Sequence, residues 1–259
     1  MIIKNLVAEA KAAIKEKVSK MTTVPSLAIV QLGDVPASNR YVKNKIKDCA
    51  EVGILVNHYP LRENISEESL ISLIKTLNED GIIVQLPLPG HIDPQVVAAA
   101  IPTEKDVDGF QHNSPFIPCT PGGIIWYLDQ IKFPVERCNA VVIGRSDIVG
   151  KPMAKLLTDR NATVTLCHSR TPQEDLEYYL AHANLVICAV GKAGFLDPRL
   201  APHALIVDVG INFDENGKLV GDVARVDGCL AHVTPVPGGV GLLTRLALLQ
   251  NVVRASNDD

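Results

Sequence analysis

The chain has 259 residues, of which 47% are hydrophobic and 21% charged, with a net charge of −4 and a pI near 6.0. This length suits one large or two small globular domains. The acidic balance argues against a general binder of nucleic acid, and no apolar run approaches the roughly 18 residues that a membrane span needs.

The predicted elements of the first half alternate between helix and strand. In chain order they are a helix over 1–21, a strand over 26–33, a helix over 36–53, a strand over 54–61, a helix over 65–80 and a strand over 81–89. Alternating strands and helices are typical of parallel βαβ units with helices on both faces of the sheet. The third helix has a capping signal at residues 64–67.

A Pro/Gly-rich break over residues 116–123 is the candidate domain joint, and a short apolar helix follows it. The second alternating set is a strand over 139–144, a helix over 149–157, a strand over 162–169, a helix over 173–183, a strand over 184–191, a strand over 204–211 and a final helix over 242–256. Its strand-helix-strand-helix-strand order is that of a mononucleotide-binding unit.

The six cysteines contain no C-x-x-C pair, so neither a disulfide framework nor a zinc site is expected. Cys167 and Cys188 lie in apolar runs, and we expect buried thiols there. Asp106 and Asp108 stand two apart before a glycine, but one short cluster is poor support for a metal. We expect no metal and a reducing compartment, most simply the cytoplasm.

A glycine turn follows the strand over 139–144, in the sequence GRSDIVGKP. Gly144 lets the backbone turn tightly and approach a phosphate, and a helix N-terminus follows. The pattern differs from G-x-G-x-x-G, because Ser146 replaces the second glycine. A plain strand-to-helix turn is the alternative interpretation.

The next strand ends in His168, Ser169 and Arg170, where an NAD site usually has an acidic residue. Cations and hydroxyl groups suit the 2′-phosphate of NADP, and Arg145 in the glycine turn could reach the same place. The sequence therefore favours NADP over NAD, with a solvated strand end as the alternative.

Two further polar positions admit a structural and a functional interpretation. Tyr41 and Lys45 are four residues apart in a predicted helix and share one face, which is also typical of a charged helix edge. Gln85 interrupts the apolar run GIIVQLPLP, so it either completes a buried hydrogen-bond network or faces a cleft.

Seven motifs, in order, are similar to those of the methylenetetrahydrofolate dehydrogenase/cyclohydrolase family of the bacterial FolD type. They are PASNRYVKNKIKDCAEVGI, GIIVQLPLP, KDVDGF, FIPCTPGGI, GRSDIVGKPMAKLL, ATVTLCHSRT and TPVPGGVG, and they span roughly residues 26 to 245. After the last motif the family usually continues Pro-Met, whereas this chain has Leu242-Leu243, which puts the shape of that loop in doubt.

The resemblance implies two α/β domains with a cleft between them. The expected bounds are 1–118 for a folate-binding catalytic domain, completed by a C-terminal helix over 241–259, and 119–240 for a Rossmann-type NADP-binding domain. It also implies a homodimer and two activities in one-carbon metabolism. These are NADP-dependent oxidation of 5,10-methylenetetrahydrofolate to the methenyl cation and hydrolysis of that cation to 10-formyltetrahydrofolate.

The resemblance also assigns residues. Lys45 matches the catalytic lysine, Tyr41 the tyrosine that packs against folate, Gln85 the glutamine that holds the lysine, and Asp108 the aspartate that binds the pterin. The positions that match the cofactor site are Gly144, Arg145, Ser146, Ser169 and Ile211, to which the charge argument adds Arg170. The loop beside the folate contains Pro237, Gly238 and Gly239.

Three other interpretations stay open at this point. A dehydrogenase that has lost hydrolysis would have no need of Lys45 and Gln85. A non-catalytic nucleotide-binding protein of the same fold would form no NADPH from the folate. Another small NADP dehydrogenase of the shikimate type would share the two-domain plan but not Y-x-x-x-K together with VQLPLP.

Overall fold

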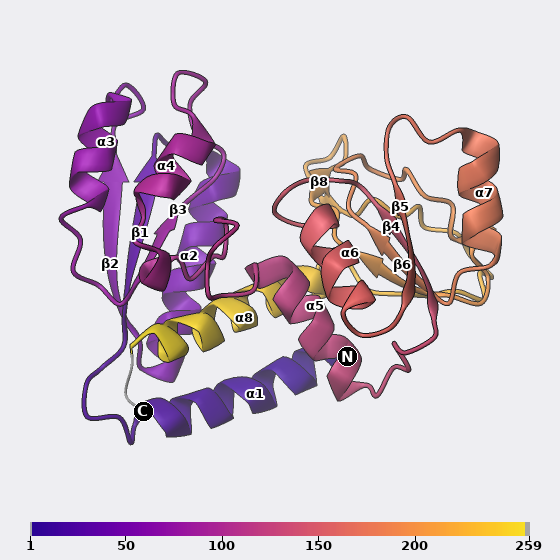
Figure 1. The fold of residues 1–259 in the computed structure, drawn as a ribbon, viewed down its shortest axis with the longest axis horizontal. Helices are drawn as coiled ribbons and strands as arrows, with labels where there is room; N and C mark the ends of the chain where they lie inside the picture. Colours follow the sequence, from indigo (N-terminus) through magenta and orange to yellow (C-terminus); the bar gives the residue numbers. More distant parts are fainter. Residues whose placement is uncertain (1, 257–259) are drawn as a thin grey trace. The chain divides into compact units, whose positions relative to one another are not determined.

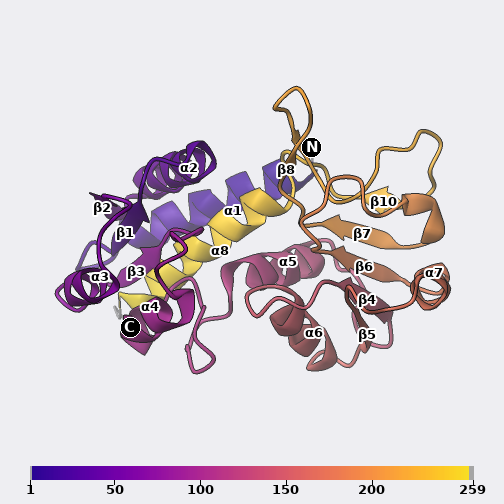
Figure 2. The ribbon, with the colours of Figure 1, turned by 90° about the horizontal axis from the view of Figure 1, so that it is seen from above.

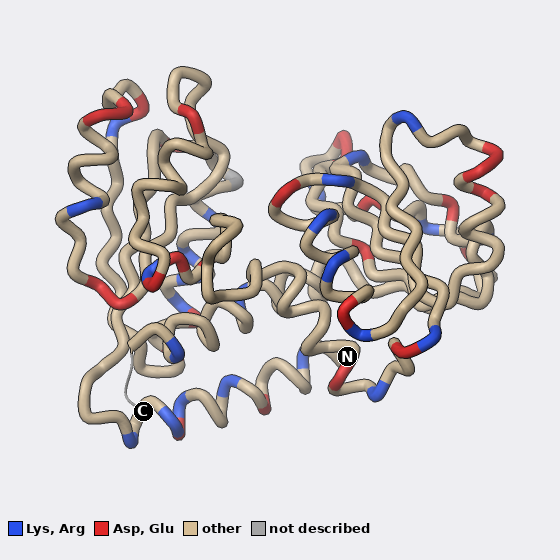
Figure 3. The backbone as a smooth tube through the Cα atoms, viewed as in Figure 1, with Lys and Arg blue, Asp and Glu red and all other residues tan. Residues whose placement is uncertain are grey.

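The computed structural model describes residues 2–256 and has the predicted α/β architecture, with helices packed on parallel sheets (Figure 1). It contains two compact units. The first unit runs from Val7 to Cys119 and takes in the chain from Arg245 onward, while the second runs from Thr120 to Thr244 and includes the first residues up to Leu6. Basic and acidic residues occur along the backbone of each unit (Figure 3). Within residues 2–256, no helix combines the length and the hydropathy needed to cross a membrane.

The first unit is built on a parallel sheet with the strand order β2-β1-β3. Its elements in chain order are α1 (Ile2–Val18), β1 (Ser26–Leu32), α2 (Pro36–Val52), β2 (Leu55–Leu61), α3 (Glu67–Ile74), β3 (Gly81–Val84), α4 (Pro94–Ala100) and a 3-10 turn (Thr103–Lys105). The last helix, α8 (Val240–Ala255), runs from the second unit into the first.

Alternation along β1 directs its side chains into two separate cores. Leu27 and Ile29 pack with apolar residues of α1, α2 and α8, including Val52 and Val252. Ala28, Val30 and Leu32 pack on the other face with residues of α3 and α4. The central strand is therefore buried on both sides, as parallel sheets require.

A buried carboxylate joins three helices of the first unit. Asp48 on α2 is 6% exposed and accepts from Lys11 Nζ on α1 at 2.6 Å and from Arg245 Nε on α8 at 2.5 Å. Two cations on one carboxylate offset the cost of burying it. Asp48 thus fixes the returning C-terminal helix against the N-terminal ones.

The second unit contains a parallel sheet with the order β10-β7-β6-β4-β5, which Figure 2 shows from above. Its elements are α5 (Cys119–Gln130), β4 (Asn139–Ile143), α6 (Gly150–Thr158), β5 (Thr163–Cys167), α7 (Gln173–Ala181), β6 (Leu185–Cys188), a 3-10 turn (Pro198–Leu200), β7 (Leu205–Asp208), a hairpin of β8 (Asn212–Phe213) and β9 (Leu219–Val220), and β10 (His232–Val233). Helices α5 and α6 pack on one face and α7 on the other.

The predicted break over residues 116–123 contains the start of a helix. Helix α5 begins at Cys119 and includes Gly123, where a Cβ atom would lie 2.4 Å from the Leu243 carbonyl oxygen of α8. The glycine is thus required for close helix packing within the second unit. Helix α3 is shorter than predicted, and Ser66 caps it by accepting from Ser69 N at 3.2 Å.

Five of the six cysteine thiols are buried, and all six are free. Burial raises the pKa of the Cys49 thiol to about 12 and also raises the pKa values of the other four buried thiols, Cys119, Cys138, Cys167 and Cys188. Cys229 is the half-exposed one.

Because the thiolate is the reactive form, we expect an aromatic disulfide reagent at about pH 8 to modify Cys229 rapidly in the folded protein. The other five thiols should react only after denaturant is added. Absorbance of the released thiolate against time measures both phases, and rapid reaction of two or more thiols in the folded protein would contradict the burial described above.

Candidate active site

Helix α2 places one of its lysines inside the first unit and leaves its neighbours outside. The helix runs from Pro36 to Val52, and Gly53 caps it in the left-handed conformation with φ of 89°. Lys45 is 8% exposed, whereas Lys43 and Lys47 are exposed. Lys45 therefore sits where an ammonium group needs polar partners.

Those partners come from two other parts of the first unit. Lys45 Nζ donates to Gln85 Oε1 at 3.2 Å and lies 4.0 Å from Asp108 Oδ2. Gln85 follows β3 directly, and Asp108 lies in the loop after the 3-10 turn. The structure thus brings together three predicted site residues that are 40 and 23 positions apart in the chain.

Gln85 has a fixed orientation because both ends of its amide are engaged. Its Nε2 donates to the Leu86 carbonyl oxygen at 2.8 Å, so Oε1 is the end that faces Lys45. The Ser38 hydroxyl group donates to the same carbonyl oxygen at 3.4 Å and is 4% exposed. Ser38 carries no distinct signal in the sequence, since a serine near a helix start is ordinary.

The Asp108 loop is held by a second aspartate, Asp106, whose role the sequence pattern does not reveal. Asp106 is 1% exposed and accepts from the backbone N–H groups of Phe110 at 3.2 Å and Gln111 at 2.9 Å. Burial raises the pKa of the Asp106 carboxyl, and these N–H groups oppose the rise. Gly109 has φ of 71°, and a Cβ atom there would lie 2.7 Å from Pro118 N. Asp106 and Gly109 together set the position of Asp108.

Tyr41 lies one helical turn before Lys45 and is half-buried. Burial raises the pKa of its hydroxyl group, and the positive charges of Arg245 and Arg40 oppose this effect. The phenol therefore stays neutral near pH 7, and its ring offers a flat apolar surface beside the lysine.

In the second unit, the backbone of the glycine turn predicted after β4 packs closely against the segment after β6 and against the start of α6. Gly144 has φ of 116°, and a Cβ atom there would lie 2.1 Å from the Ala189 carbonyl oxygen, which follows β6. A Cβ atom on Gly150, the first residue of α6, would lie 2.0 Å from the Gly144 carbonyl oxygen. Larger residues would open the turn, so both glycines are required for the close approach of these backbone segments.

The polar residues predicted for the cofactor occupy two neighbouring loops. Because Ile143 pairs with Cys167 in the parallel register of β4 and β5, the residues just beyond them leave the sheet side by side. Arg145 and Ser146 are exposed in the first loop, and the exposed pair Ser169 and Arg170 belongs to the second. These side chains offer two guanidinium and two hydroxyl groups at the carboxyl edge of the sheet.

The remaining predicted residues lie elsewhere in the second unit. Ile211 is 46% exposed and stands between β7 and β8. Pro237, Gly238 and Gly239 form the turn before α8, and Gly238 has φ of 100°. The buried Leu243 that follows packs its backbone against Gly123, as described above.

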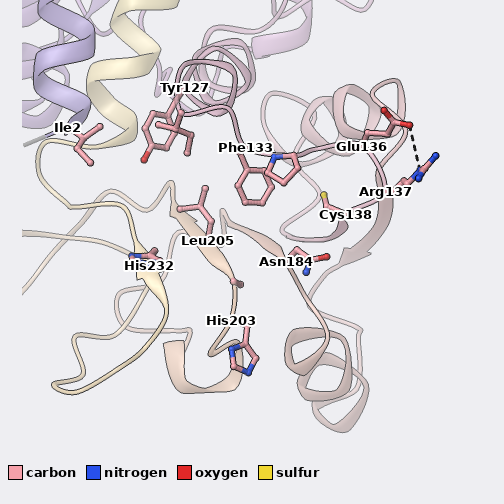
Figure 4. A pocket seen from close by; sticks show the side chains of 13 residues that line it. Ile2, Tyr127, Phe133, Glu136, Arg137, Cys138, Asn184, His203, Leu205 and His232 are labelled. Carbon is pink, nitrogen blue, oxygen red and sulfur yellow. Dashed lines mark ion pairs between the residues drawn. The ribbon is translucent and has the colours of Figure 1, made fainter.

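A cavity of about 640 Å³ in the second unit contains none of these residues (Figure 4). Tyr127, Phe133 and Leu205 line it together with His203 and His232. It opens at the amino ends of β4, β6, β7 and β10, where the strands begin. Ligands of open α/β sheets bind at the opposite, carboxyl edge, so this cavity is not the candidate site.

Comparison with known proteins agrees with this geometry. The tetrahydrofolate dehydrogenase/cyclohydrolase catalytic domain matches residues 1–108, and the NAD(P)-binding domain of the same family matches residues 118–259. The bifunctional protein FolD of Lysinibacillus sphaericus is 44% identical in an alignment that covers 99% of this chain and 94% of the relative.

Solved structures give the same result. The bifunctional dehydrogenase/cyclohydrolase FolD of Campylobacter jejuni superposes with a TM-score of 0.92 at 41% identity, covering 98% of this chain and 96% of that one. The Trypanosoma brucei dehydrogenase-cyclohydrolase, solved with NADP cofactor and inhibitor, gives a TM-score of 0.89 at 31% identity over 97% of this chain and 94% of that one.

The fold and the two sites thus define a two-domain α/β enzyme that uses a nicotinamide dinucleotide. More particularly, the chain belongs to the tetrahydrofolate dehydrogenase/cyclohydrolase family. The predicted family is therefore confirmed.

Proposed function

We propose that this chain oxidises 5,10-methylenetetrahydrofolate with NADP and then hydrolyses the methenyl product to 10-formyltetrahydrofolate, with Lys45 as the catalytic base of the second step. The observation that carries the proposal is the buried contact of Lys45 Nζ with Gln85 Oε1, beside the Asp108 carboxylate. A dehydrogenase without cyclohydrolase activity would not need a positioned base such as Lys45.

The residues at the carboxyl edge of the second sheet fit NADP. Gly144 and Gly150 let the turn after β4 close tightly against the start of α6, and a tight glycine turn of this kind suits a pyrophosphate. Arg145, Ser169 and Arg170 present positive charge and a hydroxyl group in the neighbouring loops after β4 and β5, and these groups suit a 2′-phosphate. NADP supplies the hydride acceptor when bound, and the protein contributes alignment of the two rings rather than acid-base chemistry.

In the hydrolytic step the substrate is a cation, and its charge affects the balance between the protonated and neutral forms of the Lys45 amine. A cation bound beside Lys45 disfavours the ammonium form relative to the free amine. The neutral amine takes a proton from water as the water oxygen bonds to the methenyl carbon. The bond from that carbon to N5 then breaks, N5 is protonated, and one proton is released overall.

The other predicted residues have positioning or binding roles in this proposal. Gln85 holds the lysine amine through its fixed amide oxygen. Asp108 accepts from ring N–H groups of the pterin, which draws part of its charge away from Lys45. Tyr41 packs against the folate, and the turn of Pro237, Gly238 and Gly239 contributes to folate binding.

We extend the proposal to assembly and location: the family resemblance implies a homodimer that works in the cytoplasm, without a membrane or nucleic-acid partner. The free thiols agree with a reducing compartment. Light scattering would give twice the monomer mass of 27.9 kDa for a homodimer.

The parent protein should form NADPH when it receives 5,10-methylenetetrahydrofolate and NADP, and 10-formyltetrahydrofolate should then accumulate. NADPH absorbance and acid quenching of the folate products measure the two steps separately, and a parallel assay with NAD measures cofactor preference. Binding of NADP without NADPH formation would indicate a non-catalytic protein, while methenyl product without hydrolysis would indicate a dehydrogenase alone.

Arg145→Ala should lower catalytic efficiency with NADP by about tenfold to a hundredfold, because a charge-assisted contact is worth roughly 1.5–3 kcal/mol. Efficiency with NAD, which has no 2′-phosphate, should barely change. Lys155→Ala is the matched control, since Lys155 is an exposed α6 cation paired with Asp159 at 2.6 Å. Equal losses with both cofactors would assign Arg145 to the fold or to the pyrophosphate.

Lys45→Met should slow hydrolysis of methenyltetrahydrofolate by about 10²–10⁴-fold, because the aliphatic stem remains and the positioned base is lost. Some hydride transfer should survive, so methenyltetrahydrofolate should accumulate. Stopped-flow absorbance and acid quenching follow the two products.

Lys43→Met is the matched control on the same helix, where the side chain is exposed, and both steps should stay near parental rates. If Lys45→Met hydrolyses the methenyl substrate as fast as the parent, Lys45 is only a helix charge and the proposed mechanism is wrong.

A further inference from the structure

The sheet of the second unit has one topological switch point, and it lies between β4 and β6. From β4 the chain moves to β5 on one side and then crosses to β6 on the other (Figure 2). Ligands of open parallel sheets bind where the strand order reverses. The loop of Val190–Lys192 after β6 therefore faces the glycine turn after β4, as the contact between Gly144 and Ala189 shows.

A completely buried carboxylate holds this loop from behind. Asp222, which follows β9, is 0% exposed. Its Oδ2 accepts from Val190 N at 2.6 Å and Gly191 N at 2.9 Å, and its Oδ1 accepts from Lys192 N at 2.9 Å. Three successive backbone N–H groups thus converge on one side chain, as they do in anion-binding nests.

The same carboxylate also reaches the loop that contains Ile211. Asn212 Nδ2 donates to Asp222 Oδ1 at 2.8 Å, so one side chain connects the loops after β6 and β7. Asp222 is fixed in turn by Asp208 at the end of β7, whose Oδ1 accepts from Asp222 N at 2.8 Å and Gly210 N at 3.0 Å.

The Asp208 and Asp222 carboxylates are packed tightly against two glycines. A Cβ atom on Gly210 would lie 2.3 Å from Asp222 Oδ1, and one on Gly221 would lie 1.8 Å from Asp208 Oδ2. The two glycines therefore admit the two carboxylates into the space behind the loops. On the outer side, Val190 is 38% exposed and Ile211 is 46% exposed, so these side chains face solvent.

We propose that Asp222 is a positioning residue for the dinucleotide, because it fixes the Val190–Lys192 and Ile211–Asn212 loops in the conformation that receives the cofactor at the switch point. The inference rests on the NADP site proposed above. The N–H groups of the Val190–Lys192 loop are already engaged by a carboxylate, so this loop does not bind the pyrophosphate. It contributes shape and apolar contact instead, and the phosphates bind at the turn between Gly144 and Gly150.

Asp222→Asn tests the proposal with little change in shape. An amide keeps one acceptor oxygen and turns its NH₂ group toward two N–H donors, whichever way it is rotated, so the loops lose their fixed position. If the binding conformation is then populated about a tenth of the time, the apparent Kd for NADP rises about tenfold. Equilibrium titration with NADP and the KM for NADP should both show this increase, while kcat at saturating NADP changes much less.

Hydrolysis of methenyltetrahydrofolate provides an internal control, because this step uses no dinucleotide. Its rate in Asp222→Asn should stay within about twofold of the parent, well below the tenfold change expected for NADP affinity. Asp214→Asn is the matched control variant: Asp214 lies after β8 and accepts from Asn216 N and Lys218 N, both within the β8–β9 hairpin. Its NADP affinity should equal that of the parent.

Gly210→Ala is a second variant that should produce the same defect, because its methyl group displaces the Asp222 carboxylate.

Unchanged NADP affinity in Asp222→Asn and Gly210→Ala would overturn the proposal, even if their melting temperatures fell. A proportional loss of hydrolysis and NADP binding would also overturn it, since that result means general unfolding. Failure of the proposed function looks different, because the parent protein itself would then neither bind NADP nor reduce it.

Discussion

The parallel direction of the strands is the constraint on which the rest of this structure depends. Helices bury both faces of the central strands of each larger sheet, so the polar groups of the candidate sites gather where the strands end. Because parallel strands end at the same edge, residues distant in the chain meet there. Gln85 follows β3 in this way, and Gly144 and Ala189 follow β4 and β6.

Much of the fold could be predicted because this constraint leaves a strong pattern in the sequence. Buried parallel strands are continuous apolar runs, and each of the main predicted strands is present. Short elements left no such pattern. Helix α4 has only seven residues and the β8–β9 hairpin has two residues in each strand, so tertiary packing rather than periodicity decides their conformation. Helix α5 begins inside a Pro/Gly segment that resembles a loop in sequence, and its Gly123 permits the close contact of α5 with α8.

The candidate site could be predicted only in part, because residue spacing does not show which side chains become buried or which partners they meet. Four-residue spacing places Tyr41 and Lys45 on one border of α2, but spacing alone does not say which border is buried, and the family motif was needed. The positioning role of Asp106 and any role of Asp222 could not be predicted, because an aspartate that accepts buried backbone N–H groups has the same sequence appearance as one in a solvated turn. Their partners are set by loops that have no periodicity.

The return of α8 to the first unit has a consequence for the order in which the protein is made. Leu248 and Val252 complete the same core as Leu27 and Ile29, and Arg245 binds the buried Asp48 carboxylate. During synthesis, which proceeds from the N-terminus, the first unit is exposed without this helix while the whole second unit is translated. The first unit is therefore completed only after the second has been translated, and its half-covered sheet must avoid aggregation until α8 has been made.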